Sequence, residues 1–385
     1  MVSFDNTENA FKAKSNGDLN RSYWLFKMVG NPTMVKMGAK MAPIGLAIGF
    51  KGIIKNTIFK QFVGGETITE CDRTIKELGK YNIGTILDYS VEGKESEIDF
   101  DACCKETIET IHKAKNDKFI PFCVFKVTGL ARFDLLEKVS SKKGLSEAEN
   151  SEFEKVRQRV HLICKEAHTA NKPVFIDAEE SWIQPAIDDL ADENMAVFNK
   201  EKAIVYNTFQ LYRKDRLEFL RTTIAKGKAN GFHVGAKLVR GAYMEKERAR
   251  AIEKNYPSPI QDSKEKSDSD YNAALEECVK NIDMMGLCAG THNEKSSLFL
   301  VELLSKYAIP TSDKRIFFSQ LLGMSDHISY NLALANYNVA KYVPYGPVKE
   351  VLPYLIRRAQ ENTSVKGQTG RELSLIIKEK QRRRQ

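Results

Sequence analysis

The segment Pro173–Glu180, with the sequence PVFIDAEE, joins a strand-like apolar run to a cluster of carboxylates. A short β-branched and aromatic run that ends in polar residues is typical of a buried strand. Ahead of it, Ser146–Ala167 has apolar residues at helical spacing, and Ser146 with Glu149 forms the pattern of a capping box. A helix followed by a strand with polar groups at its carboxyl end indicates an α/β fold.

The same alternation recurs along the chain. Short strand-like runs are found at Gly84–Tyr89, Phe119–Val127, Pro173–Asp177, Ala203–Phe209, Val234–Val239, Leu287–Thr291, Arg315–Gln320 and Val339–Val343, and each is followed by a stretch of helical periodicity. Eight such units over about 280 residues predict an α/β protein with a (β/α)8 barrel. An open doubly wound sheet is the alternative, but no G-x-G-x-x-G follows any strand, which disfavours its dinucleotide-binding form.

The first part of the chain has a different pattern. Gly and Pro punctuate helical runs, which we place at Ser22–Met28, Thr33–Ala42, Leu46–Phe62 and Ile68–Tyr81. We therefore predict a helical region at 1–82, a barrel domain at 83–366 and a basic tail at 367–385.

The chain has 385 residues and 42% apolar content, enough for one large core or two ordinary ones. Its seven cysteines include no C-x-x-C pair, and an odd number argues against a disulfide framework. A reducing, cytosolic setting with free thiols fits this usage. Cys103 and Cys104 lack a nearby histidine at metal-ligand spacing, so we expect plain thiols and no metal.

The net charge of +8 is concentrated near the two ends. No acid occurs between Arg21 and Gly65, whereas seven basic residues do: Arg21, Lys27, Lys36, Lys40, Lys51, Lys55 and Lys60. These are interleaved with Met, Ile and Phe rather than with stacking aromatics and Gly, which favours a membrane surface or an anionic partner over nucleic acid. Alternatively, the charges only help helices to dock on the barrel. A second basic cluster lies at Lys378–Arg384.

No segment is long and apolar enough to span a bilayer. The longest apolar run, Met41–Phe50, contains Pro43 and stops at Lys51. The N-terminus lacks the apolar core of a signal peptide. We expect a cytoplasmic protein that associates peripherally with the cytoplasmic face of the inner membrane.

In a (β/α)8 barrel the chemistry belongs at the carboxyl ends of the strands. Polar residues gather at these positions: Asp88, Lys126, Asp177, Glu179, Glu180, Asn207, Arg240, Thr291, His292, Asn293, Gln320 and Tyr342. Taken singly, each is more often a satisfied loop residue than a catalyst.

A helix near the end of the chain carries the segment Tyr354–Asn362, YLIRRAQEN. Tyr354, Arg357, Arg358 and Glu361 are spaced so that they share one helix face. Two guanidiniums beside a phenol suit a carboxylate or phosphate, because each guanidinium can donate two parallel hydrogen bonds. Taken alone, the same pattern fits the solvated face of an amphipathic helix.

Seven motifs in order resemble those of the proline dehydrogenase family. They are Phe125–Leu130 (FKVTGL), Ile176–Glu180 (IDAEE), Lys237–Tyr243 (KLVRGAY), Thr291–Asn293 (THN), Gln320–Met324 (QLLGM), Tyr342–Gly346 (YVPYG) and Tyr354–Asn362. The chain is similar to the monofunctional type, since it has no room for the fused aldehyde dehydrogenase domain of bifunctional relatives.

The resemblance implies a distorted barrel that holds FAD non-covalently. L-Proline would be oxidised to Δ1-pyrroline-5-carboxylate by hydride transfer to flavin N5, and electrons would pass to a membrane quinone. This is the first step of proline catabolism to glutamate, so a separate pyrroline-5-carboxylate dehydrogenase would take the product.

The motifs also imply roles for individual residues. Lys126, Arg357 and Arg358 should hold the proline carboxylate, and Tyr243, Tyr342, Tyr354 and Leu321 should wall the ring. Asp177 should orient the Arg and Tyr side chains, and Lys237 should stabilise charge on the reduced flavin. The remaining FAD contacts implied are Asn207, Arg240, Gly241, Ala242, Thr291, His292, Asn293, Gln320 and Glu361.

Two points remain open at this stage. Hydride leaves the carbon next to nitrogen, so the amine must be neutral, yet no side chain presents itself as the base; the family pattern assigns His292 to the cofactor. The polar segment Asn255–Asp270 leaves the flavin-phosphate contacts unplaced, with Lys264 and Lys266 as candidates.

Two rival functions are kept. Hydroxyproline dehydrogenase, of the same superfamily, shares the YLIRRAQEN segment but tends to carry a small polar residue where this chain has Tyr342, which would crowd a ring hydroxyl. The other rival is a membrane-surface binding protein on an inactive barrel, which the basic first 65 residues motivate.

Overall fold

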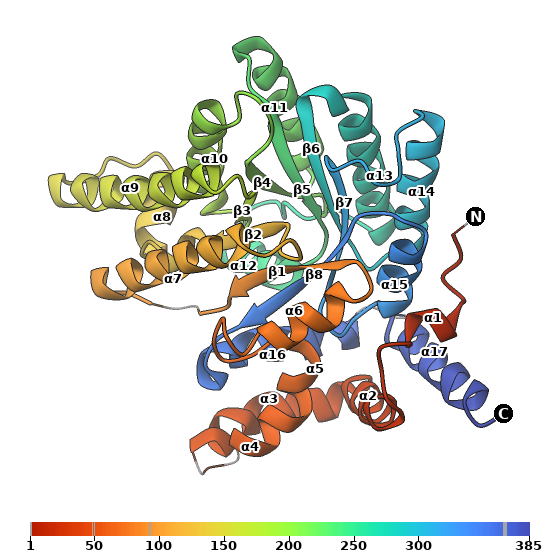
Figure 1. Cartoon of the computed structure of the whole chain (residues 1–385). Helices are drawn as coiled ribbons and strands as arrows, with labels where there is room; N and C mark the ends of the chain where they lie inside the picture. The colour runs from red at the N-terminus through yellow and green to blue at the C-terminus, as the bar shows by residue number, and fades with distance from the viewer. Residues whose placement is uncertain (1, 48, 50, 92–93, 365–367) are drawn as a thin grey trace. The chain divides into compact units, whose positions relative to one another are not determined.

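The protein is a closed barrel of eight parallel strands surrounded by helices (Figure 1), as the strand–helix alternation predicts. The computed structural model describes residues 2–47, 49, 51–91, 94–364 and 368–385; the side chains of 43–47, 360–364, 368 and 369 lie outside that description. The strands, in barrel order, are β1 (Ile83–Tyr89), β2 (Phe122–Lys126), β3 (Val174–Asp177), β4 (Val205–Gln210), β5 (Val234–Val239), β6 (Met285–Gly290), β7 (Ile316–Leu321) and β8 (Val339–Tyr345).

Every predicted strand run contains or overlaps one of these strands, and a helical stretch follows each. The helices are α1 (Thr7–Ala10), α2 (Asn16–Val29), α3 (Pro32–Ala47), α4 (Lys51–Ile54), α5 (Lys60–Phe62), α6 (Asp72–Gly79), α7 (Glu97–Lys115), α8 (Phe133–Ser140), α9 (Glu147–Thr169), α10 (Gln184–Phe198), α11 (Arg216–Asn230), α12 (Met244–Lys254), α13 (Lys264–Lys280), α14 (Glu294–Lys306), α15 (Asp326–Leu334), α16 (Val348–Ser364) and α17 (Gln368–Arg382). A π-helix spans Lys55–Phe59, and 3-10 turns span Val127–Gly129 and Ile282–Met284.

Local sequence signals explain where helices begin and end. The Ser146 hydroxyl accepts a hydrogen bond from the Glu149 amide at 3.2 Å, and the Glu149 carboxylate accepts one from the Ser146 amide at 2.7 Å. This capping box satisfies two amides at the start of α9, as predicted. The single helix predicted at 46–62 is divided instead, because Gly49 has a φ of 94°, which no α-helix accommodates.

The chain forms two compact units. Unit 1 contains Met1–Val91 and Gln320–Gln385, and unit 2 contains Glu92–Ser319. In unit 1, β1 and β8 pair with each other and belong with the terminal helices, and the domain boundary between 82 and 83 stays a prediction.

The core of unit 2 is rich in aromatic rings. Phe122 stacks on Phe175 with centroids 4.5 Å apart, and Phe122 and Phe317 meet edge to face at 4.8 Å. Tyr206 packs edge to face on Phe175 at 5.4 Å. Because these rings come from β2, β3, β4 and β7, they fill the interior between the strands.

The core of unit 1 joins segments from both ends of the sequence. Phe11, Phe26 and Phe62 are fully buried together with Val351 of α16 and Ile376 of α17. In unit 1, α17 packs on α2, and α16 packs on α3 (Figure 1). Much of the predicted basic tail is therefore a helix with a buried apolar side.

Candidate active site

A cluster of opposite charges, formed by the buried Asp177 and Lys237 and the partly exposed Lys126, lies towards the carboxyl ends of β2, β3 and β5. Lys126 and Asp177 are opposite each other in the register of β2 and β3. The Asp177 carboxylate accepts a hydrogen bond from the Lys237 ammonium, and its other oxygen lies 3.7 Å from the Lys126 Nζ. Two ammonium groups thus share one carboxylate, which leaves a positive site suited to an anion.

Aromatic packing supports this cluster from one side. The Lys237 Nζ lies 5.2 Å from the centroid of the Phe175 ring, which is part of the aromatic core. Lys237 and Asp177 are both buried, so their attraction is weakly screened by water. The three sequence-predicted residues from these strands are therefore brought together by the fold.

A second cluster of predicted residues lies after β5 and β6. The Arg240 guanidinium donates to the Thr291 hydroxyl at 2.5 Å and to the Asp268 carboxylate, and it stacks on the Tyr271 ring at 4.1 Å. The Thr291 hydroxyl also accepts a hydrogen bond from the Asn293 amide at 3.1 Å. Arg240 is thus held rigidly, with its planar group beside the ends of two strands.

Backbone geometry fixes the residues around that cluster. Gly241 has a φ of 80°, a conformation that residues with a Cβ rarely adopt, and this turn leads into α12. Asn293 caps α14 through its side-chain oxygen, which accepts a hydrogen bond from the Ser296 amide at 3.1 Å. Ala242 is exposed, whereas Tyr243 and His292 are partly exposed.

Asn207 lies in the middle of β4 rather than at its end. Its amide nitrogen donates to the Asp188 carboxylate at 2.9 Å, and the same carboxylate receives both terminal nitrogens of Arg216 at 2.8 and 2.9 Å. Its side-chain oxygen accepts a hydrogen bond from the Thr208 amide at 2.8 Å. The described contacts of Asn207 are therefore those of a buried structural network.

Gln210, the last residue of β4, is a polar group that sequence reasoning missed, because the predicted strand stopped at Phe209. Its amide donates to the Glu179 backbone carbonyl at 2.7 Å and to the Tyr212 hydroxyl at 2.9 Å. The sequence signal that could have identified Gln210 is a polar residue directly after an apolar run.

Glu179, to which the sequence motifs assign no role, is a buried carboxyl group. Burial raises the pKa of Glu179 to about 8, and the neighbouring Glu180 charge adds to this, while hydrogen bonds from Thr128 act in the opposite direction. The Thr128 amide donates to Glu179 at 3.0 Å, and its hydroxyl donates to the other carboxylate oxygen. A carboxyl group that stays protonated at neutral pH can donate as well as accept a hydrogen bond.

The predicted residues of unit 1 lie on β7, β8 and α16. Tyr354 and Arg358 are buried on α16, where the Arg358 guanidinium is 5.2 Å from the Tyr354 ring centroid, and Arg357 is partly exposed. Gln320 accepts a hydrogen bond from the Ser329 hydroxyl at 2.7 Å. The side chain of Glu361 lies outside the described residues.

The buried Lys341, next to Tyr342 on β8, contacts the backbone of Leu321. Lys341 precedes Tyr342 on β8, and its ammonium group donates to the Leu321 and Met324 carbonyls at 3.4 and 2.5 Å and pairs with Asp326 at 2.9 Å. The Leu322 amide donates to the Tyr342 carbonyl at 2.9 Å. These bonds fix the turn after β7 against β8.

The polar segment 255–270 is partly helical, because α13 begins within it and Ser263 caps that helix. Lys264 pairs with Asp268 at 2.6 Å, and Lys266 pairs with Asp262 at 3.2 Å. Both lysine side chains are exposed.

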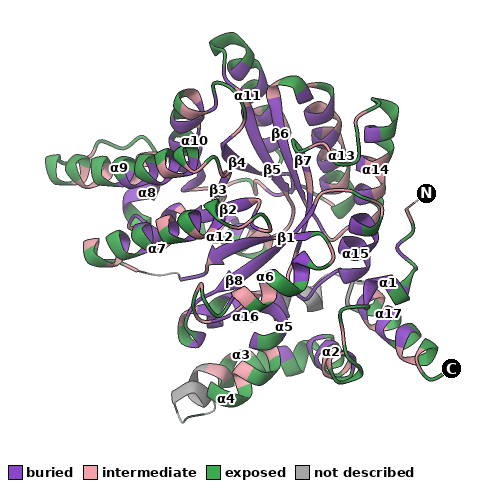
Figure 2. Ribbon diagram, in the orientation of Figure 1, coloured by how far each residue is buried: buried purple, intermediate pink, exposed green. Residues whose placement is uncertain are grey.

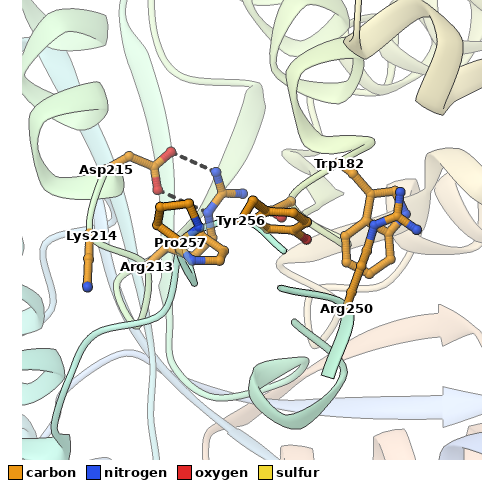
Figure 3. Close-up of a pocket in the computed structure, with 9 residues that line it drawn as sticks. Trp182, Arg213, Lys214, Asp215, Arg250, Tyr256 and Pro257 are labelled. Atoms are coloured by element: carbon orange, nitrogen blue, oxygen red, sulfur yellow. Dashed lines mark hydrogen bonds and ion pairs between the residues drawn. The ribbon is translucent and has the colours of Figure 1, made fainter. Parts of the chain in front are cut away.

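A cavity of about 380 Å³ opens elsewhere in unit 2, and Figure 3 shows the residues around it. Arg213 pairs with Asp215 at 2.7 Å on one wall, and the Arg250 guanidinium stacks on Trp182 at 4.3 Å on another. None of the sequence-predicted site residues lines it.

The fold is that of a (β/α)8 barrel whose charged side chains gather at the strand ends, where enzymes of this fold bind their ligands. The model of the proline dehydrogenase family matches residues 71–371, and the chain belongs to this family of oxidoreductases. The resemblance carried by the seven motifs is thereby confirmed, and proline oxidation is the activity that it supports.

Curated relatives agree with this assignment. Proline dehydrogenase 1, mitochondrial, of Dictyostelium discoideum is 31% identical over 98% of this chain and 74% of its own length. The hydroxyproline dehydrogenase of Xenopus laevis is also 31% identical, over 97% of this chain and 88% of its own length.

Among solved structures, proline utilization A (PutA) from Bdellovibrio bacteriovorus is similar, with a TM-score of 0.74 and 19% identity over 90% of this chain. This chain spans only 37% of that protein, and because the identity is 19%, the likeness shows the fold alone. Within the described residues, none of the helices has the length and apolar character to cross a membrane.

Proposed function

We propose that the protein catalyses FAD-dependent oxidation of L-proline to Δ1-pyrroline-5-carboxylate and passes the electrons to a quinone. Family membership supports proline as the substrate. The observation that carries the proposal is the arrangement of the Lys126 and Lys237 ammonium groups around the Asp177 carboxylate, close to the strand ends where barrel enzymes bind ligands. A separate pyrroline-5-carboxylate dehydrogenase would take the product towards glutamate.

The donor set after β5 and β6 fits a flavin dinucleotide, which has an anionic pyrophosphate and several hydrogen-bond acceptors. Arg240 offers a cationic donor, Thr291 and Asn293 offer a hydroxyl and an amide, and Lys237 within β5 offers a second cation. When bound, FAD supplies the hydride acceptor at N5. We assign Lys237 to stabilise the charge of the reduced flavin, and His292, Gln320 and Glu361 to cofactor binding on the family motifs.

The described contacts change the role proposed for Asp177. Because its carboxylate is engaged by both Lys126 and Lys237, we propose that it positions these two ammonium groups. The lysines would otherwise repel each other in a buried site.

Substrate roles are supported by the family motifs. Lys126, Arg357 and Arg358 would bind the carboxylate of proline, because a charge-assisted bidentate contact suits that group. Tyr243, Tyr342, Tyr354 and Leu321 would wall the ring. Oxidation removes a hydride from the carbon next to nitrogen and a proton from the amine, so substrate must react as the neutral amine.

Hydroxyproline dehydrogenase is the second candidate, because the Xenopus laevis relative of that name covers nearly the whole chain. The phenol of Tyr342 argues against it, since a buried ring that borders the substrate leaves little space for an added hydroxyl. We therefore favour L-proline.

An anaerobic absorbance experiment tests the function. Protein reconstituted with FAD is expected to lose its flavin absorbance on addition of L-proline and to recover it when a soluble quinone is added. Trans-4-hydroxy-L-proline should reduce the flavin more slowly. Folded protein that binds FAD but is not reduced by either substrate would overturn the proposal.

A further inference from the structure

The segment Gln61–Glu66, with the sequence QFVGGE, contacts three parts of unit 1 whose motifs are expected to bind substrate. These parts are the turn after β7, the end of β8 and the start of α16. The sequence predicts only a helix that ends at Phe62 here, and none of the seven motifs includes the segment. Because one short segment meets all three parts, it can hold them in a single arrangement.

Gln61 fixes the turn that follows Leu321. Its buried side chain donates through the amide to the Gly323 carbonyl at 2.9 Å, and its side-chain oxygen accepts a hydrogen bond from the Ser22 hydroxyl at 3.0 Å. The two backbones are also close, because a Cβ added to Gly323 would overlap the Gln61 carbonyl oxygen. Any movement of Gln61 would therefore be transmitted to the turn next to Leu321.

The two glycines lie along the carboxyl end of β8, a strand that is buried over its whole length (Figure 2). The Gly64 amide donates to the Pro344 carbonyl at 2.9 Å. Gly65 pairs with Tyr345 in a parallel bridge, and its carbonyl accepts a hydrogen bond from the Gly346 amide at 3.1 Å. These bonds attach the segment to the strand that carries Tyr342.

Glu66 joins two cations to the first turn of α16. Its carboxylate oxygens lie 2.7 Å from the Lys55 Nζ and 2.9 Å from the Lys51 Nζ. One of these oxygens also accepts a hydrogen bond from the amide of Val348, the first residue of α16, at 3.4 Å. Amides of a first helical turn have no partner within their own helix, and an anion is favoured there. Burial raises the pKa of Glu66, but its hydrogen bonds to the two lysines and to the amide outweigh this and lower the pKa to about 2.

We propose that Gln61–Glu66 is a brace that positions the substrate-binding residues of unit 1, with Glu66 as the positioning residue for α16. That helix carries the tyrosine and the two arginines proposed to contact proline, so a shift of its first turn would move all three. The same brace holds the turn next to Leu321 and the strand that carries Tyr342. The inference rests on the proposed function, which assigns these residues to the substrate.

The first measurement is steady-state kinetics of the FAD-loaded protein with L-proline. Glu66→Ala removes both the ion pairs and the bond to α16, and it should raise KM about tenfold. Glu66→Gln keeps an oxygen that can accept a hydrogen bond from the Val348 amide, so it should raise KM only about threefold. Gln61→Ala, which loses the bond to the Gly323 carbonyl, should also raise KM about threefold.

Glu77→Ala is the matched control. Glu77 also pairs with a cation of unit 1, Arg73 at 2.8 Å, but both side chains are exposed on α6. This variant should keep the KM of the unaltered chain. A variant that only destabilises the fold loses active protein, which lowers kcat but leaves the KM of the folded fraction unchanged. A rise in KM therefore separates positioning from general damage.

The second measurement is hydrogen exchange at the backbone amides of α16, which needs no substrate. In Glu66→Ala, the amides at the start of this helix should exchange about tenfold faster, because the carboxylate that satisfies the first of them is lost. Mass spectrometry of peptides that span 348–359 measures this change. Peptides from α13 in unit 2 should exchange as they do in the unaltered chain.

Two results would overturn the inference. One is a KM for proline in Glu66→Ala that equals that of Glu77→Ala, and the other is unchanged exchange of α16 in Glu66→Ala. If Glu66→Ala does not fold, Glu66→Gln is judged by the same two measurements. If L-proline does not reduce the flavin of the unaltered chain, the proposed function fails by itself, and the exchange measurement still decides whether Glu66 fixes α16.

Discussion

Replacing Asp177 with Asn tests whether the strand-end cluster is a desolvated charge site. The change keeps the shape of the side chain but removes the carboxylate charge that Lys126 and Lys237 share. The buried Lys237 and the partly buried Lys126 would then lose the carboxylate that they share.

The structure sets the expected size of the effect. At the 3.7 Å separation of Lys126 and Asp177, one pair of unit charges contributes about 4 kcal/mol at an effective dielectric constant of about 20. Breaking a buried pair by removing one partner costs about 3–5 kcal/mol, because a charge is left uncompensated. Asp177→Asn should therefore lower the free energy of unfolding by about 3–5 kcal/mol.

The assay is urea unfolding at neutral pH, followed by circular dichroism. Asp101→Asn is the matched control, because that carboxylate also takes a 2.8 Å hydrogen bond from a buried Arg159 but is largely exposed. The control should lose less than about 1 kcal/mol. Equal losses in the two variants would refute the reasoning, because they would mean that water screens the Asp177 pairs as it does those of Asp101.

Other predictions concern the substrate and the buried carboxyl group. Arg357→Met or Arg358→Met should raise KM for proline, because the free energy of proline binding should become less favourable by about 2–5 kcal/mol, while FAD stays bound. Steady-state kinetics of each variant checks this, and an unchanged KM in both would contradict it. Tyr342→Ser should shift the ratio of kcat/KM values towards trans-4-hydroxy-L-proline, and a constant ratio would mean that Tyr342 does not border the ring. The pKa of Glu179 is raised from 4.5 to about 8 in the folded protein, so the unfolded chain loses this proton first as pH rises, and stability should fall between about pH 4.5 and 8. Glu179→Gln, measured by unfolding across that range, should flatten this dependence, and an unaltered slope would assign it to other groups.

Much of the barrel could be predicted from the sequence because each strand is a short apolar run with a helix after it. Val234–Val239 was predicted at its observed bounds, and Ser146 marked the start of α9 through a capping box that depends on local bonds only. Periodicity and capping involve residues close in the chain, so they are visible without tertiary information.

Features that depend on distant contacts were missed. The two lysines that pair with Asp177 come from β2 and β5, and no pattern in either segment indicates that both contact the same carboxylate. The 367–385 segment looked like a charged tail, yet Leu375 and Ile376 are buried against helices from the start of the chain. The burial of these two side chains by distant helices is indicated in the local sequence only by a weak apolar stripe.

Unit 1 has a consequence for the order in which the chain is made. Its two segments are held together by contacts such as those of Asn9, which donates to the Tyr330 carbonyl at 2.8 Å, and Arg383, which donates to the Phe11 carbonyl at 2.9 Å. During synthesis, all of unit 2 is made after the first segment of unit 1 and before the second. Unit 2 is continuous in sequence and can form its contacts as it leaves the ribosome. Phe11, Phe26 and their neighbours, in contrast, remain exposed to water until α16 and α17 have been synthesised. The helices at the start of the sequence are therefore the part of the nascent chain that most needs a chaperone.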